Sequence, residues 1–390
     1  MKFNEVVNLI TKDEVVELAQ KMVQFNTVNP PGNEKILADF LGEKFKSYDI
    51  DSEIIDLGDN RANVIGRIKG SGERKALLLN GHLDVVPPGD VEWEHGPFSG
   101  AVVDGKLYGR GSADMKGGLA GMIMAAKAVK AAGIPLKGDL IVAGTAGEED
   151  DSIGAFHFLE NDGLKDVGGI LIGEPTSCEI NIAEKGAFWV EITAYGKTAH
   201  GAFPQEGVNA ILHANLILNE IQKYEYKYTQ NDFLGDPTLN ISTISGGVKT
   251  NVVPDKCSFT IDMRTVPSID HDDIIKDFEA IISRLKEDHP DLNATVKVIN
   301  NRPAVETNPD HEFIKSAQKV AKDIFNKDLE PKGVSFYTDA AVFLPTTNLP
   351  AIIYGPGASD MAHQPNEHIT IDNLWEATQF YIGMILEYLA

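Results

Sequence analysis

The stretch ALLLNGHLDVVP, residues 76–87, joins a short apolar run to a histidine and an acid. Residues 76–79 have the length and composition of a buried strand, and they lead directly to His82 and Asp84. Further short apolar runs occur at residues 140–143, 169–172 and 351–354. Segments with helical character alternate with them, such as residues 119–132. This alternation predicts an α/β fold with a largely parallel sheet flanked by helices.

The middle of the chain has a different pattern. Residues 257–264 alternate strictly between apolar and polar side chains, which predicts a strand with one solvated face. Residues 188–195 alternate in the same way, and residues 210–224 have the pattern of an amphipathic helix. We therefore predict an α+β domain, residues 187–298, inserted into an α/β domain formed by residues 1–186 and 299–390.

Composition excludes several classes of function. The chain has 390 residues, of which 43% are apolar and 24% charged, the balance of a soluble globular protein. Its net charge of −23 argues against nucleic acid or a membrane surface as partner. The start of the chain lacks the features of a secretory signal, so we expect a cytoplasmic protein. Only Cys178 and Cys257 occur, which argues against a disulfide scaffold and a thiolate metal site.

Acids and histidines follow these strand-like runs, and most are expected beyond the carboxyl ends of the strands, where ligands collect in an open α/β sheet. Taken alone, each of these acids and histidines could be an ordinary loop histidine, a helix-capping residue or a surface charge. Together, several carboxylates in one cleft would repel one another unless cations compensate. Histidine and carboxylate ligands suit two divalent ions, zinc above all, with cobalt or manganese as alternatives. The candidates are His82, Asp84, Asp114, Glu148, Glu149, Glu174 and His363.

These motifs in combination resemble the M20 family of metallopeptidases and deacylases over nearly the whole chain. The matching segments are GHLDVVP at 81–87, YGRGSADMKGG at 108–118, GEE at 147–149, GEPT at 173–176 and the C-terminal His363. The resemblance is strongest to the branch of succinyl-diaminopimelate desuccinylases and acetylornithine deacetylases. It implies a zinc-exopeptidase-like catalytic domain and an inserted lid that also forms the dimer.

The resemblance also implies a ligand set. His82 and Glu174 would bind one ion. Glu149 and His363 would bind the other, and Asp114 would bridge the two. The peptide bond after Asp114 is often cis in the family.

Five further residues receive roles from the same resemblance or from their chemistry. Glu148 would be the general base, and Asp84 would accept the other ring N–H of His82. His200, in the segment GKTAHG, would reach the scissile carbonyl, usually from a partner subunit. Asn251 and Arg264 would bind the substrate carboxylate, for which a guanidinium fork is well suited.

The substrate is the least determined feature. We expect a small N-acyl amino acid, and we favour desuccinylation of N-succinyl-diaminopimelate slightly over deacetylation of acetylornithine. The segment SFYTDA at 335–340, where the family lines its substrate pocket, lies between the patterns of the two activities. A dipeptidase or aminoacylase is the next alternative. A non-catalytic binding module on the same fold is disfavoured, because such proteins usually lose a ligand or the base.

Overall fold

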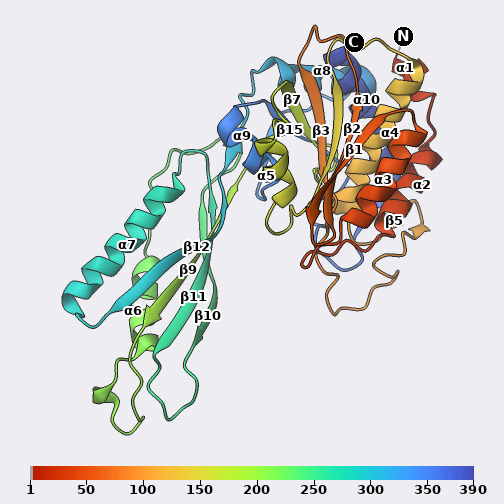
Figure 1. The fold of residues 1–390 in the computed structure, drawn as a ribbon. Helices are drawn as coiled ribbons and strands as arrows, with labels where there is room; N and C mark the ends of the chain where they lie inside the picture. Colours follow the sequence, from red (N-terminus) through yellow and green to blue (C-terminus); the bar gives the residue numbers. More distant parts are fainter. Residues whose placement is uncertain (1–2) are drawn as a thin grey trace. The chain divides into compact units, whose positions relative to one another are not determined.

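The computed structural model describes residues 3–390, which form two compact units (Figure 1). The first unit runs up to Ile182 and also contains Glu306–Gly333 and Thr338–Ala390. The second unit consists of Ala183–Val305 with the short segment Val334–Tyr337. The predicted insertion, residues 187–298, lies inside the second unit.

The first unit is built on a nine-stranded sheet in the order β1-β2-β6-β3-β7-β15-β8-β13, with β14 beside β8. Its centre, β6-β3-β7-β15, is parallel, while β1, β2 and β8 pair antiparallel with their neighbours. The sheet is therefore parallel where it is most buried, as predicted. Its strands are β1 (Asp51–Gly58), β2 (Arg61–Ile68), β3 (Ala76–His82), β6 (Leu140–Thr145), β7 (Val167–Ile172), β8 (Asn181–Glu184), β13 (Val305–Glu306), β14 (Lys332–Val334) and β15 (Ala351–Ile353).

The predicted apolar runs are the central strands because both faces of the sheet are covered. Every residue of β3, β6 and β15 is buried. Figure 1 shows α2, α3, α4 and α10 on one side of the sheet and α5 on the other. The helices of this unit are α1 (Phe3–Val7), α2 (Lys12–Val23), α3 (Lys35–Ser47), α4 (Gly117–Ala132), α5 (Ile153–Glu160), α8 (Glu312–Phe325), α9 (Ala340–Thr347) and α10 (Ile371–Leu389).

Helix ends follow the local sequence. Thr11 and Glu14 form a reciprocal capping box at the start of α2, as their spacing predicts. Helix α4 ends at Gly133, whose left-handed backbone (φ 62°) suits a residue without a Cβ atom. All but a few side chains of α4 are buried, which explains why its sequence is so apolar.

A small three-stranded sheet, in the order β16-β5-β4, completes the first unit. It consists of β4 (Val102–Val103), β5 (Lys106–Tyr108) and β16 (His368–Thr370). Strands β5 and β16 are antiparallel, with Tyr108 opposite His368. This pairing brings two segments together that are far apart in the sequence.

The second unit is an antiparallel sheet in the order β10-β11-β9-β12, packed against two helices. The alternation predicted around residue 260 is observed in β11, where Cys257, Phe259, Ile261 and Met263 are buried and form a core with the helices. Its elements are β9 (Gly186–Tyr195), a 3₁₀ turn (Pro204–Glu206), α6 (Ala210–Ile221), β10 (Thr238–Gly246), β11 (Lys256–Thr265), α7 (His271–Asp288) and β12 (Asn293–Arg302). Among residues 3–390, no helix combines the length and the apolar character needed to cross a membrane.

Candidate metal centre

Three adjacent parallel strands deliver most of the predicted donors to one edge of the central sheet. His82 is the last residue of β3, Glu148 and Glu149 follow β6, and Glu174 follows β7. Since β6, β3 and β7 are neighbours with the same direction, their carboxyl ends lie side by side. This is the edge at which open α/β sheets bind their ligands.

Asp114 reaches the same place by a different route. It lies in the short segment Ser112–Lys116 between β5 and α4, where its own backbone is not helical (φ −125°, ψ 96°). The sequence pattern placed Asp114 at the end of a strand of the central sheet. This prediction is wrong, because the strand that precedes Asp114 is β5 of the small sheet. The peptide bond between Asp114 and Met115 is cis, as the family resemblance implies.

His82 lies at the centre of the cluster and is almost fully buried. Its Nε2 atom lies 3.1 Å from Oδ1 of Asp114, 3.5 Å from Oε1 of Glu174 and 4.0 Å from Oε2 of Glu148. Donor atoms of His82, Glu148 and Glu174 all lie within 4.8 Å of one another, and so do those of His82, Asp114 and Glu149. Glu148, predicted to be the base, is thus within ligand distance.

His363 closes the cluster from the loop between β15 and β16. Its Nε2 atom lies 3.0 Å from Oε2 of Glu149 and 3.4 Å from Oδ2 of Asp114. Unlike His82, its side chain is half exposed, and its backbone is left-handed with a φ of 62°. Asp114 thus faces His82 with one carboxylate oxygen and His363 with the other, the geometry that a bridging ligand requires.

The electrostatics of the cluster fit divalent cations. Burial raises the pKa of Glu148 and of Glu174 well above the usual value, and nearby carboxylates add to both shifts. Burial acts to lower the pKa of His82, but Glu174 and Asp114 outweigh it and raise that pKa well above its usual value. These raised pKa values favour the protonated forms in the chain alone, and ions of charge +2 would compete with those protons.

Asp84 organises the loop that carries the two glutamates. Its Oδ1 atom accepts hydrogen bonds from the backbone N–H groups of Gly147 (2.9 Å) and Glu148 (3.1 Å). Its Oδ2 atom accepts one from the N–H of Glu149 (3.2 Å) and one from the side chain of Asn29 (2.9 Å). The closest partner of Nδ1 of His82 is the backbone oxygen of Asp84 at 3.0 Å. The carboxylate is farther away, at 3.6 Å.

Sequence analysis assigned no role to several buried polar residues behind the cluster. Asn29 holds Asp84, and Arg110 and Glu367 form an ion pair next to Asp114 and His363. Asp339 accepts a hydrogen bond of 2.6 Å from the Thr145 hydroxyl, and burial raises the pKa of its carboxyl. Arg110 belongs to a quoted motif, but its partners are distant in sequence and no local pattern reveals them.

The segment 335–340, which is expected to line the substrate pocket, is less exposed to solvent than this role implies. The side chains of Thr338, Asp339 and Ala340 are buried. Within this segment, residues 335–337 are partly or fully exposed.

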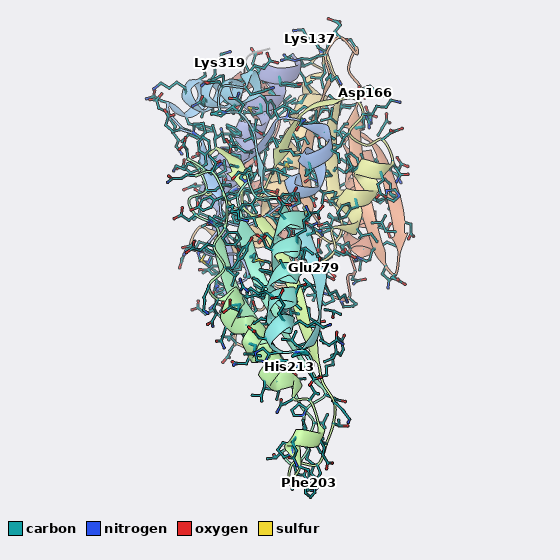
Figure 2. All side chains as sticks on the ribbon, turned by 90° about the vertical axis from the view of Figure 1, so that its left-hand side faces the viewer. Lys137, Asp166, Phe203, His213, Glu279 and Lys319 are labelled. Carbon is teal, nitrogen blue, oxygen red and sulfur yellow. The ribbon has the colours of Figure 1, made fainter. Side chains whose placement is uncertain are left out.

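The remaining predicted residues belong to the second unit. His200 is exposed and forms a β-bridge with Val252, next to Asn251. It lies in the loop that carries Phe203, which Figure 2 shows at one end of this unit. The fork of Arg264, on β11, already engages Asp262 through Nε (3.0 Å) and Nη2 (3.1 Å).

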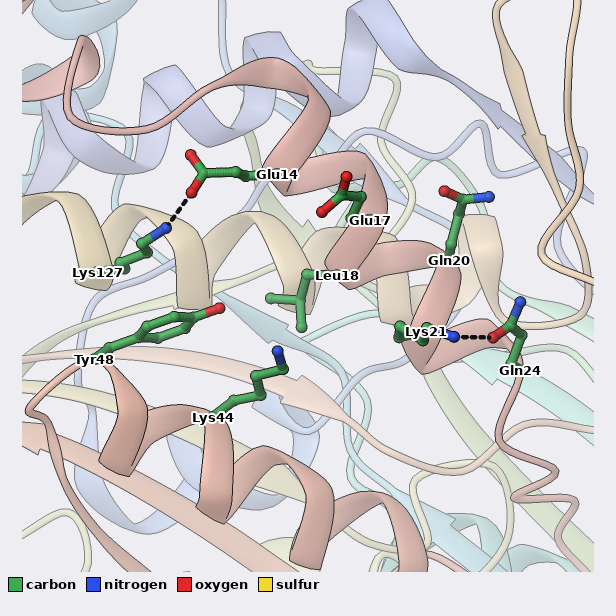
Figure 3. A pocket seen from close by; sticks show the side chains of 9 residues that line it. All are labelled: Glu14, Glu17, Leu18, Gln20, Lys21, Gln24, Lys44, Tyr48 and Lys127. Carbon is green, nitrogen blue, oxygen red and sulfur yellow. Dashed lines mark hydrogen bonds and ion pairs between the residues drawn. The ribbon is translucent and has the colours of Figure 1, made fainter.

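A pocket of the first unit lies between α2, α3 and α4, away from the donor cluster (Figure 3). It is lined by charges of both signs, two glutamates and three lysines. Lys127 Nζ lies 2.6 Å from Oε1 of Glu14, and Lys21 Nζ donates to Oε1 of Gln24 at 3.2 Å. The concentration of buried acids seen around His82 is not repeated there.

The fold and the clustered donors define a metal-dependent hydrolase of amide bonds. Comparison of sequences identifies the group: the model of Peptidase family M20/M25/M40 matches residues 78–387, and the chain belongs to this family. A Staphylococcus epidermidis protein named "Probable succinyl-diaminopimelate desuccinylase" is 32% identical, over 98% of this chain and 100% of that protein. A protein of the same name from Staphylococcus aureus is also 32% identical, over 97% and 98%.

Solved structures share the fold. An M20 family metallo-carboxypeptidase from Sulfolobus solfataricus matches with a TM-score of 0.79 and 19% identity, over 96% of this chain and 99% of that one. A tripeptidase from Staphylococcus aureus matches with a TM-score of 0.78 and 24% identity, over 97% and 99%. A dinuclear metal-binding M20 peptidase from Bacillus subtilis matches with a TM-score of 0.73 and 17% identity, over 96% and 97%.

Proposed function

We propose that this hydrolase removes the succinyl group from N-succinyl-LL-2,6-diaminopimelate, giving succinate and LL-2,6-diaminopimelate. The gathering of six acid and histidine side chains at one edge of the sheet supports amide hydrolysis with two metal ions. The names of the relatives at 32% identity support the choice of substrate. We further propose cytoplasmic residence and no nucleic acid or membrane partner.

The residues fit two ions. His82 and Glu174 would hold one of them, Glu149 and His363 would hold the other, and Asp114 would bridge. Zinc is the proposed metal, with cobalt or manganese able to use the same donors. When bound, such ions make water acidic and polarise an amide carbonyl.

Glu148 is the proposed general base. Its backbone N–H donates a hydrogen bond to Asp84, which fixes the position of Glu148. Its side-chain carboxyl is buried, and burial raises the pKa of that group. A carboxylate in that environment can accept a proton from the attacking water and deliver it to the leaving amine. His200 would donate a hydrogen bond to the developing oxyanion.

Substrate carboxylates would be bound by Asn251 and Arg264. Since Asp262 engages Nε and Nη2 of Arg264, the guanidinium is oriented in advance. The Nη1 atom is then the donor that we expect to face a substrate carboxylate.

The decisive experiment replaces Glu148 with Gln. This change keeps the shape of the side chain and removes its ability to accept the proton. We expect about two ions per chain by metal analysis and a loss of about 10²–10⁴-fold in kcat. Full activity in the variant would exclude Glu148 as the base, and a wild-type chain that binds no metal would exclude the proposal as a whole.

Substrate choice needs a direct comparison of kcat/KM. N-succinyl-diaminopimelate, N-acetylornithine and a set of dipeptides should be measured with the same metal-loaded protein. We expect the succinylated compound to be preferred. A preference for acetylornithine would identify a deacetylase, and a preference for dipeptides would identify a peptidase. Equally low values on all three would mean that the substrate is a different amide.

A further inference from the structure

The small sheet brings together the two loops that meet at the bridging position. Strand β5 leads to Asp114, and strand β16 begins directly after the loop that carries His363. The two strands pair at Tyr108 and His368, and the backbone N–H of Gly109 donates to the oxygen of Glu367 at 2.9 Å. The relative position of the two donors thus depends on what holds these segments together next to the cluster.

Glu367 binds the segment that contains Asp114. Its side chain is fully buried, and Oε1 accepts hydrogen bonds from the backbone N–H groups of Ala113 (2.8 Å) and Asp114 (3.0 Å). Its other oxygen, Oε2, lies 2.6 Å from Nη1 of Arg110. Both oxygens are therefore used, and neither faces solvent.

Arg110 binds the segment that contains His363. Its Nη2 atom donates to the backbone oxygen of His363 at 3.2 Å and to that of Pro87 at 3.4 Å. Its Nη1 atom also lies 3.4 Å from the backbone oxygen of Gln364, and the guanidinium carbon lies 5.2 Å from the ring centre of Trp93. One planar fork thus contacts the loop after β3 and the loop after β15 at the same time.

We propose that Arg110 and Glu367 are positioning residues of the two-metal centre. Together they join the backbones of Asp114 and His363, which belong to segments about 250 residues apart. His363 depends most on this support, because its side chain is half exposed and comes from a long loop. The hydrogen bonds of both side chains go to backbone atoms or to each other, so the pair would act on the centre through its donors. Their effect is to hold the bridging carboxylate and the last histidine at one separation. This inference rests on the proposed function.

The test compares metal affinity and kinetics in Arg110→Lys, in Glu367→Gln and in the double variant Arg110→Gln/Glu367→Gln. Lysine keeps the positive charge but lacks the planar fork. The double variant leaves no unpaired buried charge, so it keeps the experiment decisive if a single variant fails to fold. Arg67→Lys is the control, because Arg67 pairs with Asp139 at the opposite end of β6.

We expect each variant at the pair to bind the ions about 10–100-fold more weakly and to lose kcat with little change in KM. Excess metal should restore part of the lost kcat, and Arg67→Lys should match the wild type. Unchanged ion affinity and kcat in the folded double variant would overturn the proposal. A lower melting temperature with normal metal affinity would also overturn it, since that result indicates a purely structural pair. A wild-type protein that binds no ions would instead refute the proposed function itself.

Discussion

At the residue scale, the candidate centre is a group of acids whose pKa values are shifted in opposite directions. Glu148, Glu149 and Glu174 all have pKa values raised first by burial, while Asp114 has a lowered one. Burial is the largest single influence on the pKa of Asp114 and acts to raise it, but hydrogen bonding to His82 and the charges of His82 and His363 together outweigh it. Shifted pKa values of this kind, gathered within a few ångströms, are typical of functional sites.

This arrangement predicts how pH changes stability with and without metal. Carboxyl groups whose pKa is raised by folding stabilise the metal-free protein at low pH, and this contribution is lost as pH rises through the raised pKa. Bound ions need the deprotonated groups, so their stabilisation grows over the same range. We expect the difference in melting temperature between zinc-loaded and EDTA-treated protein to increase from about pH 5 to about pH 8.

Thermal unfolding followed by fluorescence at several pH values checks this expectation. In Glu148→Gln one titrating group is removed, so the increase should be shallower than in the wild type. A difference in melting temperature that is constant across the range would show that protons and metal do not compete at these residues.

The sequence predicted the candidate metal donors, but it did not predict the buried residues whose hydrogen bonds hold the donor segments in place. His82, Asp114, Glu149, Glu174 and His363 are brought together in the structure, because strand ends and family motifs mark them. Their roles remain predictions. Asn29 and Glu367 carry no such mark, since a buried hydrogen bond across the fold leaves no periodic signal in the sequence.

At the element scale, α4 approaches the end of β7 so closely that only glycine fits. A Cβ atom on Gly118 would lie 2.1 Å from the backbone oxygen of Gly173. Gly173 directly precedes Glu174, so the start of the helix contacts the backbone next to the proposed metal ligand. The apolar pattern predicted α4 itself, but a contact between distant backbones cannot be read from it.

Gly118→Ala should therefore damage both the fold and the site. We expect a loss of about 1–3 kcal/mol in the free energy of unfolding, the usual cost of overpacking, together with weaker metal binding. Denaturant titration and metal analysis would measure the two effects. Gly96→Ala is the matched control, because a Cβ atom there meets no atom within 4 Å. If both variants behave like the wild type, the close approach of α4 has no energetic importance.

At the scale of the whole molecule, the second unit leaves a sheet edge unpaired within the described chain. Strand β10 is the outer strand, its residues are largely exposed, and they include Ile244. Exposed edge strands are sites of association with other chains. We propose a homodimer through this unit, with His200 acting in the active site of its partner.

Subunit complementation tests this arrangement. Each of Glu148→Gln and His200→Ala should be nearly inactive alone. Unfolding and refolding a mixture should restore activity, because one site of a mixed dimer then receives an intact Glu148 and an intact His200 from different subunits. Failure of the mixture, or full activity in a sedimenting monomer, would contradict the trans role.

The order of the donors along the chain sets the moment in biosynthesis at which the centre can form. His82 is synthesised about 280 residues before His363, which follows β15, the strand that pairs with β7. A nascent chain that stops short of this segment carries the acids without the full donor set. In the proposed centre, metal capture would therefore wait for the segment of His363, and a product terminated before it would be inactive even if most of its sheet had formed.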